Sequence, residues 1–353
     1  MTAIGRIKDA VLRLAWRAGV MERVRLSKWR RDRLLILCYH GVSLDDEHEW
    51  NPRLYMPPAF LRRRLELLTD GGYTILSLDE GVRRLREGNL PPAAICLTFD
   101  DGAYDFYARA YPVLCEFGVP ATVYQTSYYA DFARPVFDVM VSYLLWKGRR
   151  DGVSFDALVP GIGVRDLRDL AARGEVHHRI LQYAAEAELT GEAKDHLLVA
   201  LASMLGIDFE ALRARRLLHI MQPDEIRELA ERGVDFQLHT HRHRTPRERD
   251  AFDAEISENR EWLARVTGRD PHHCCYPSGV YRNEMLPWLA AGDVHSATTC
   301  DPGIATPRSA PLLLPRFVDN SEVSEQVFMA WASGAADFLP RRTRFAHPEQ
   351  HAV

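Results

Sequence analysis

The chain has 353 residues, of which 46% are hydrophobic and 27% charged, enough to bury a full core as one barrel-sized domain or as two smaller ones. This composition excludes an intrinsically disordered chain. The net charge of −4 gives the molecule as a whole no nucleic-acid-binding character, so we expect no nucleic acid among its partners.

The N-terminal segment differs from the rest of the chain in its charge. Residues 1–33 carry ten Lys or Arg and three acids, a net charge of +7 in a chain whose total is −4. Apolar residues recur through this segment at helical spacing, namely Ile4, Ile7, Val11, Leu14, Ala18 and Met21, which predicts a basic amphipathic helix over residues 1–33. Arg13 and Arg17 interrupt its apolar runs before they reach the length of a signal peptide core.

Two interpretations of this N-terminal helix remain open. The helix could pack against the following domain, or it could lie in the surface of a membrane that carries anionic lipids. No apolar run elsewhere has the length of a membrane span. We therefore expect a cytoplasmic protein with peripheral contact to the inner face of the membrane through residues 1–33.

Seven apolar runs in the remainder have the composition of buried strands. They are LLILCYH, AAICLTFD, PATVYQT, VDFQLHTH, HHCCYP, HSATT and PLLLPRF. Helical patterns follow most of them, which is the alternation typical of a parallel sheet. The sequence predicts an α/β fold, a distorted (β/α)7 TIM-like barrel over residues 34–335.

This alternation stops between Val136 and Ala230. The intervening sequence has the pattern of consecutive amphipathic helices, so we expect a helical insertion over about residues 136–230, on one side of the barrel mouth. Residues 336–353 have the character of a C-terminal tail.

The six cysteines are scattered and lack the paired spacing of a zinc ribbon or a disulfide framework. Several stand inside the predicted strands. We expect reduced core residues, including the neighbours Cys274 and Cys275, because a strand turns adjacent side chains to opposite faces.

Two aspartates stand side by side where the second strand ends, in TFDDG at Thr98 to Gly102. An apolar run cut off by Asp-Asp-Gly predicts a strand that surfaces at a turn. Both carboxylates would then lie at the C-terminal end of the strand, where α/β barrels carry their active sites.

Three histidines follow the fourth strand in HTHRH, at His239, His241 and His243. His239 and His243 share a side if the chain turns helically, whereas His239 and His241 share a face if it stays extended. Either pair could chelate a metal ion together with one aspartate. Such a set of three ligands leaves positions open on an ion such as zinc, which is typical of a catalytic site.

TFDDG and HTHRH together resemble the first two motifs of the polysaccharide deacetylases that share the NodB homology domain, and the resemblance runs from about Leu34 to Val318. It implies a distorted barrel of about seven β/α units and removal of an acetyl group, mainly N-acetyl, from a sugar. It also implies that Asp100 is the catalytic base and that Asp101, His239 and His243 bind one divalent ion, which we take to be zinc. We expect the partner to be an N-acetylated sugar, an oligosaccharide or, because of the expected contact with the membrane, a lipid-linked glycan.

Amide hydrolysis supports this division of roles. A divalent ion lowers the pKa of a bound water to about 7, and a neighbouring carboxylate can accept the proton of the water. The developing oxyanion needs a donor, for which the backbone N–H of Ser278 in YPSG is our candidate.

The later motifs depart from the family pattern. The arginine that normally braces the catalytic aspartate is missing before Pro277, and Phe317 stands where the family has its general-acid histidine. We expect Arg316 to replace the bracing arginine and His295 to supply the acid.

Two other functions stay open. One is an amidohydrolase-like barrel that acts on a non-sugar amide through an extended pair of His239 and His241. The other is a carbohydrate-binding protein that has lost catalysis, for which the eroded later motifs argue.

Overall fold

The computed structural model describes residues 12–14 and 16–338. Seven parallel strands close into a barrel in the order β1-β12-β11-β10-β9-β6-β5, and β5 pairs back onto β1. Their bounds are β1 Leu35–Tyr39, β5 Ala94–Phe99, β6 Thr122–Gln125, β9 Asp235–Leu238, β10 His273–Cys275, β11 Ser296–Pro302 and β12 Leu314–Val318. Each strand overlaps one of the seven predicted runs, and only β11 and β12 extend beyond theirs, so the predicted α/β barrel of seven strands is confirmed.

An eighth strand, β4 (Thr74–Leu76), was not predicted. It pairs with the first half of β5, while β6 pairs with the second half of β5. The remaining strands form two small ladders, β2 (Gly41–Val42) with β3 (Tyr55–Met56) and β7 (Val153–Ser154) with β8 (Val164–Arg165).

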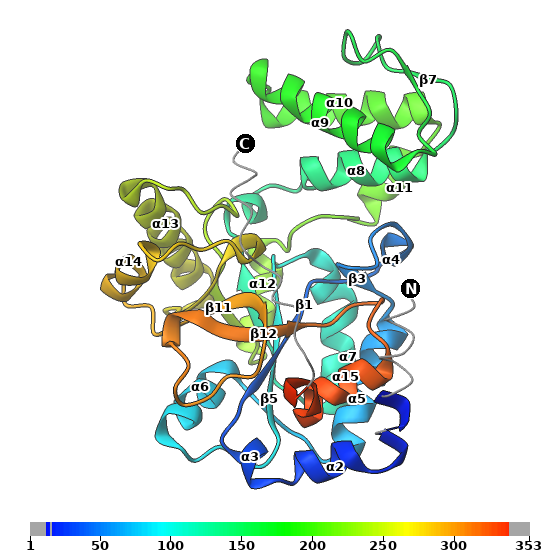
Figure 1. Cartoon of the computed structure of the whole chain (residues 1–353). Helices are drawn as coiled ribbons and strands as arrows, with labels where there is room; N and C mark the ends of the chain where they lie inside the picture. The colour runs from blue at the N-terminus through cyan, green and yellow to red at the C-terminus, as the bar shows by residue number, and fades with distance from the viewer. Residues whose placement is uncertain (1–11, 15, 339–353) are drawn as a thin grey trace.

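Helices surround the barrel (Figure 1). On the chain between β3 and β9 these are α5 Pro58–Asp70, α6 Leu78–Glu87, the π-helix η1 Phe106–Ala110, α7 Tyr111–Phe117 and α12 Pro223–Glu231. After β9 come α13 Arg249–Thr267, α14 Met285–Ala291, α15 Glu325–Ser333 and the 3-10 turns η3 Pro277–Gly279, η4 Pro311–Leu313 and η5 Ala335–Phe338.

Successive side chains along each strand point to opposite faces, which divides the apolar core into two clusters. Leu35 and Leu37 face the surrounding helices in the main apolar cluster, whereas Leu34 and Ile36 belong to a smaller cluster with Cys96 and Cys275. Nearer the C-terminal ends of the strands the buried side chains are polar, among them Thr98, Thr298 and Arg316. The barrel therefore has an apolar floor with charged groups above it.

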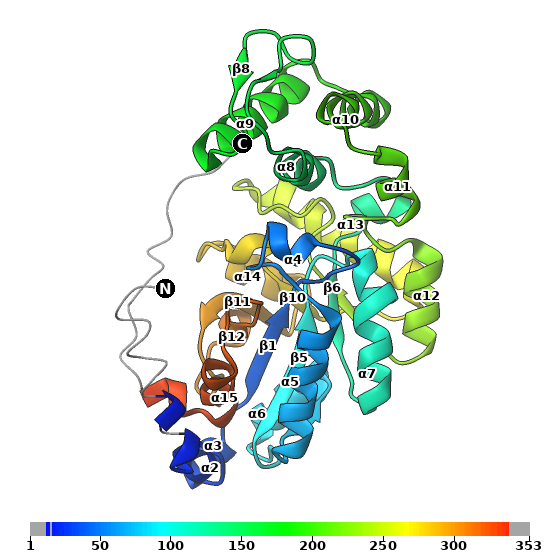
Figure 2. The same cartoon turned by 90° about the vertical axis from the view of Figure 1, so that its right-hand side faces the viewer.

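The helical insertion forms a cap with its own apolar cluster. The cap comprises α8 Phe137–Lys147, α9 Leu170–Glu186, α10 Gly191–Leu205 and α11 Phe209–Ala214, with the ladder of β7 and β8. It stands above the C-terminal end of the barrel (Figures 1 and 2). Its α8 contacts the loop after β2, where α4 (Glu47–Trp50) lies: Tyr143 and Lys147 bind the Asp46 carboxylate at 2.5 and 2.6 Å.

The range expected for the insertion extends one helix too far. Ile226 and Leu229 of α12 belong to the apolar cluster of the barrel and not to that of the cap. An amphipathic pattern is the same in both kinds of helix, so the pattern alone could not separate them.

The N-terminal segment is not the single helix that its spacing predicted. Gly19 adopts a left-handed φ of 69° and ends one helical stretch, after which α2 (Val20–Arg25) and α3 (Lys28–Arg31) follow. Met21 is buried, and Arg30 is fully buried, with Nη2 donating to the Ala94 carbonyl oxygen at 3.0 Å. This part of the segment packs against the barrel; residues 1–11 lie outside the described residues.

In the described part of the chain, no helix combines the length and the apolar character needed to cross a membrane. Of the expected C-terminal tail, residues 336–338 belong to η5, and residues 339–353 lie outside the described residues.

Candidate metal centre

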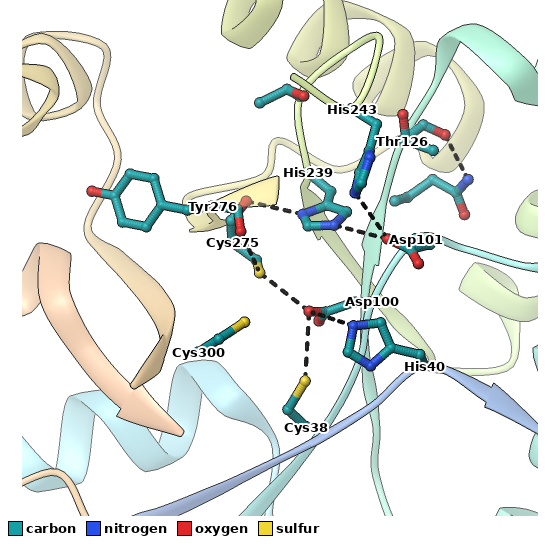
Figure 3. Close-up of polar contacts among 12 residues, drawn as sticks. Cys38, His40, Asp100, Asp101, Thr126, His239, His243, Cys275, Tyr276 and Cys300 are labelled. Carbon is teal, nitrogen blue, oxygen red and sulfur yellow. Dashed lines mark hydrogen bonds and ion pairs between the residues drawn. The ribbon is translucent and has the colours of Figure 1, made fainter. Parts of the chain in front are cut away.

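The polar residues predicted from the strand ends meet at the C-terminal mouth of the barrel (Figure 3). Asp100 and Asp101 directly follow β5, and His239 and His243 follow β9. Parallel strands end on the same side of a closed barrel, so these side chains approach each other although about 140 residues separate them along the chain.

Asp101, His239 and His243 form one cluster. Nε2 of His239 and Nε2 of His243 each lie 3.1 Å from Oδ1 of Asp101, and all three ligand atoms lie within 4.8 Å of one another. One carboxylate oxygen and two imidazole nitrogens suit a divalent ion of the zinc type. These three residues therefore fit the metal that the sequence predicts.

The orientation of His239 supports this assignment. Its Nδ1–H donates to the Cys275 carbonyl oxygen at 2.9 Å, which leaves the lone pair of Nε2 directed at Asp101. Its backbone N–H donates to Oδ1 of the buried Asn259 at 2.9 Å. Asn259, on α13, in turn donates to the carbonyl oxygen of Gln125 and to the Ser127 hydroxyl. The end of β10, the helix α13 and the end of β6 therefore hold His239 in place.

The backbone around the ligands is strained. Asp101, Thr240 and His243 have left-handed φ values of 71°, 61° and 57°, which cost free energy for residues other than glycine and cluster at functional sites. Gly102 has a φ of 74°, and a Cβ atom there would lie 2.1 Å from the side chain of Gln125. The TFDDG turn therefore requires its glycine.

Asp100 faces the barrel interior, where Arg316 binds it. Nη1 and Nη2 of Arg316 each lie 2.7 Å from a different carboxylate oxygen, and the two side chains are 0% and 3% exposed. Burial alone would raise the pKa of Asp100, but the charge and hydrogen bonds of Arg316 outweigh it and hold this pKa well below its usual value. Asp100 is therefore ionised at neutral pH.

Three thiols surround this ion pair. Sγ of Cys275 and Sγ of Cys38 lie 3.4 and 3.5 Å from Oδ2 of Asp100, and Cys300 lies 3.8 Å from Nη2 of Arg316. All three cysteines are free, and burial raises the pKa of each thiol. They are reduced residues, as expected, but they line the site and not a distant part of the core.

His40 is a site residue that the sequence analysis missed. It follows β1, and its Nε2 lies 3.9 Å from Oδ2 of Asp100 with 18% of the side chain exposed. The run LLILCYH contains the signal that would have identified it, because His40 ends its strand in the same way as the Asp pair ends β5.

Comparison with known proteins identifies the family to which the chain belongs. The model of the family described as polysaccharide deacetylase matches residues 87–144 and 178–294, which include both aspartates and all three histidines of HTHRH. This chain belongs to the polysaccharide deacetylase family.

Sequence relatives share only part of their length with this deacetylase-family chain. Bacillus subtilis YxkH, named for polysaccharide deacetylation, is 33% identical over 93 residues, which cover 26% of this chain and 31% of YxkH. The poly-β-1,6-N-acetyl-D-glucosamine N-deacetylase of Escherichia coli K12 is 32% identical over 95 residues, which cover 26% of this chain and 14% of that protein.

Solved structures share the fold more broadly. The Streptococcus pyogenes deacetylase PplD, solved in complex with acetate, has a TM-score of 0.56 at 19% identity and covers 85% of this chain and 98% of its own. IcaB from Ammonifex degensii has a TM-score of 0.55 at 16% identity, with 86% and 97% covered. These similarities show the barrel fold.

Arg316 comes from β12 and binds both carboxylate oxygens of Asp100. That it replaces the bracing arginine of the family's third motif stays a prediction. Ser278 lies in η3, which follows β10 at the mouth of the barrel; its side chain is exposed and its φ is left-handed, at 55°. The role of its backbone N–H as an oxyanion donor stays a prediction.

His295 is not brought to this site, which corrects the expectation that it supplies the general acid. It precedes β11 and therefore lies at the opposite, N-terminal end of the barrel. There it stacks on His272 with ring centroids 4.4 Å apart, and Nε2 lies 3.2 Å from the Asp293 carboxylate.

His241 offers a direct test of the ligand set. Its Nδ1 lies 2.8 Å from the Ser127 hydroxyl and its Nε2 3.3 Å from Glu258, so the ring is held by these groups and not by Asp101. We expect His243→Ala to lose bound zinc and His241→Ala to retain one equivalent, measured by elemental analysis after dialysis. Loss of zinc from His241→Ala alone would instead favour the extended pair of His239 and His241.

Proposed function

We propose that this chain is a metal-dependent deacetylase that hydrolyses the N-acetyl group of a hexosamine in an oligosaccharide or polysaccharide. The observation that carries the proposal is that a cluster of metal-ligand residues and an ionised carboxylate lie side by side at the barrel mouth. The cluster of Asp101, His239 and His243 suits a divalent ion, and Asp100, the residue before Asp101, is an ionised buried carboxylate. The name of the Escherichia coli relative supports an N-acetylglucosamine polymer as substrate class.

The ligand residues and Asp100 divide the chemistry. Asp101, His239 and His243 would hold a divalent ion, which would supply Lewis-acid chemistry to the acetyl carbonyl and to a water. Asp100 accepts the proton of the attacking water. Arg316 holds both carboxylate oxygens of Asp100, so this base keeps one orientation.

His40 is our proposed proton donor to the leaving amine. It lies beside Asp100 in Figure 3, with Nε2 3.9 Å from Oδ2 of Asp100 and 18% of its side chain exposed. Without a proton the nitrogen would have to leave as an amide anion, which is a poor leaving group, so it must gain a proton as the C–N bond breaks. His40 is placed for this step, whereas His295 lies at the other end of the barrel.

We expect His40→Gln to lower the rate of N-acetyl hydrolysis by about tenfold to a hundredfold, as for loss of a general acid. Hydrolysis of p-nitrophenyl acetate should change little, because nitrophenolate leaves without protonation. Steady-state rates on both substrates, with the His295→Gln variant as the matched control, test the role. Equal losses on amide and ester would contradict it.

Acetate release tests the proposed function itself. The purified chain, loaded with one equivalent of zinc, should release acetate from β-1,6-linked N-acetylglucosamine oligomers and lose this activity with a chelator. Asp101→Ala should be inactive at the same zinc concentration. A zinc-loaded protein that binds the oligomers without releasing acetate would favour the degenerate carbohydrate-binding alternative.

The amidohydrolase-like alternative receives less support. It needs further histidines at later strand ends, but His272 and His273 stand before and at the start of β10, away from the mouth. His241, the partner that it requires for His239, is bound to Ser127 and Glu258.

We also propose that the protein works in the cytoplasm and docks on anionic lipid through its N-terminal segment. While Met21 packs inward, apolar and basic side chains of this segment alternate on its surface. Among the described residues the exposed ones are Arg13, Leu14, Arg17, Ala18, Val20, Arg23, Leu26, Lys28 and Arg31. Each basic group near an anionic surface contributes about 1 kcal/mol, so reversible binding is expected.

Cosedimentation with phosphatidylserine vesicles tests the docking. The full chain should pellet at low salt and be released at high salt, and a Leu14→Asp/Leu26→Asp variant should stay in the supernatant. A chain that fails to pellet with these vesicles at low salt would contradict the membrane proposal and leave the deacetylase proposal intact.

A further inference from the structure

Two aromatic side chains lie exposed on the rim of the barrel mouth. Tyr128 opens the 3-10 turn η2 (Tyr128–Asp131), which follows β6 after Thr126 and Ser127, and Phe132 is the first residue after this turn. Each is 40% exposed, and their ring centroids are 5.3 Å apart. Single exposed apolar residues need no explanation, but two adjacent aromatic rings beside a candidate active site do.

Hydrogen bonds fix this turn to the loop that carries the metal ligands. The backbone N–H of Tyr128 and the hydroxyl of Thr126 both donate to the His241 carbonyl oxygen, at 2.8 and 3.0 Å. His241 stands midway between His239 and His243 in the sequence. The aromatic pair therefore has a defined position relative to the metal site.

The neighbouring rings do not stack on Tyr128. Tyr129 and His241 meet it at interplanar angles of 87° and 85°, and Phe132 at 58°. Edge contacts of this kind hold the ring in place without stacking on its face.

A guanidinium group lies over one face of each ring. Arg242 is 5.6 Å from the ring centroid of Tyr128, and Arg134 is 5.9 Å from that of Phe132, so the opposite face of each ring is the one available to a ligand. Arg242 is held by an ion pair with Glu258 at 2.8 Å, and Arg134 by one with Asp195 of the cap at 2.8 Å. The turn thus combines aromatic surface with fixed hydrogen-bond donors.

We propose that Tyr128 and Phe132 form a platform for a pyranose ring of the saccharide chain, one that neighbours the reacting sugar. A pyranose has an apolar C–H face, which packs on aromatic rings, and a rim of hydroxyl groups, which accept hydrogen bonds from Arg242 and Arg134. The proposal rests on the saccharide substrate proposed above and adds to it a preference for chains over single sugars.

Equilibrium binding to the full-length, metal-free chain tests the platform without turnover. The probes are the β-1,6-linked N-acetylglucosamine hexamer and the N-acetylglucosamine monomer, titrated by calorimetry. The hexamer should bind more tightly than the monomer. Tyr128→Ala and Phe132→Ala should each weaken hexamer binding by about fivefold or more, as expected for loss of one aromatic contact, and leave monomer binding unchanged.

Two control variants separate stacking from loss of structure. Tyr128→Trp should retain hexamer binding, and Phe338→Ala, which removes a 63% exposed aromatic residue outside the mouth, should bind like the wild type. Unchanged hexamer affinity in both alanine variants, or equal weakening for hexamer and monomer, would overturn the platform. Retained hexamer preference without acetate release by the zinc-loaded chain would support the platform while overturning the deacetylase proposal.

Discussion

Asp100→Asn is expected to retain one equivalent of zinc and to lower kcat for N-acetyl hydrolysis by about a hundredfold or more. The substitution keeps the shape of the side chain and removes the base that accepts the proton of the water. The ligand atoms of Asp101, His239 and His243 are untouched, because Asp100 is not one of these three ligands and Arg316 binds both of its carboxylate oxygens. Zinc content and single-turnover acetate release measure the two effects separately.

Asp101→Asn is the matched control for this pair of neighbours. It should lose both zinc and activity, because it replaces an anionic ligand by a neutral one. A near-normal rate in Asp100→Asn would refute the assignment of the base. Loss of zinc from Asp100→Asn would show that the two aspartates do not divide their roles as proposed.

Arg316→Met should be the most destabilising of the proposed substitutions. It leaves the Asp100 carboxylate buried without its charged partner, and breaking a buried ion pair from one side costs about 3–5 kcal/mol. The free energy of unfolding, measured by urea denaturation of the metal-free protein, should fall by this amount near neutral pH. Activity should fall as well, since the base loses both bonds that orient it.

The pH dependence of this deficit has a defined sign. In the wild type the pKa of Asp100 lies below its unfolded value, so its contribution to stability is present above that value and is lost only in strong acid. Without Arg316, burial would raise the folded pKa of Asp100, and stability would then be lost as the pH rises through that pKa. The deficit of Arg316→Met should therefore be larger at pH 8 than at pH 5.

The double variant Asp100→Asn/Arg316→Met separates charge from packing. Removing both charges should restore part of the stability that Arg316→Met loses, because no uncompensated carboxylate stays buried. If the double variant is as unstable as the sum of the two single variants, Arg316 stabilises the barrel by packing and by its bond to the Thr299 carbonyl, and not through Asp100.

The strands and the metal cluster could be predicted because they depend on local pattern. Apolar runs give the strands, and a polar residue that directly follows a parallel strand must lie at the mouth. Asp101 and His239 satisfy this rule, and so does His40, which we overlooked. His295 violates the rule because it precedes β11 and so lies at the other end; the direction of the strand decides its place.

The environment of Asp100 could not be read in full from the sequence. Arg316 and Cys275 approach it across the barrel interior, from β12 and from the end of β10. Which inward positions share one level depends on the stagger of the strands, and the register between β11 and β12 shifts between Thr298 and Pro302. No periodicity within one strand reports such a shift.

The N-terminal helices and the candidate site occupy opposite poles of the barrel. In Figures 1 and 2, α2 and α3 lie below the beginnings of β1 and β5, while the strands run away from them toward the mouth under the cap. A molecule resting on lipid through α2 would thus turn its mouth toward the aqueous phase, with the whole length of the barrel in between. A sugar joined to a lipid of the same leaflet by a short linker could not bend back far enough to enter. The docked enzyme would instead receive water-borne saccharides, or the distal units of a chain long enough to extend past the barrel, so membrane attachment would set where it works without selecting a lipid-linked substrate.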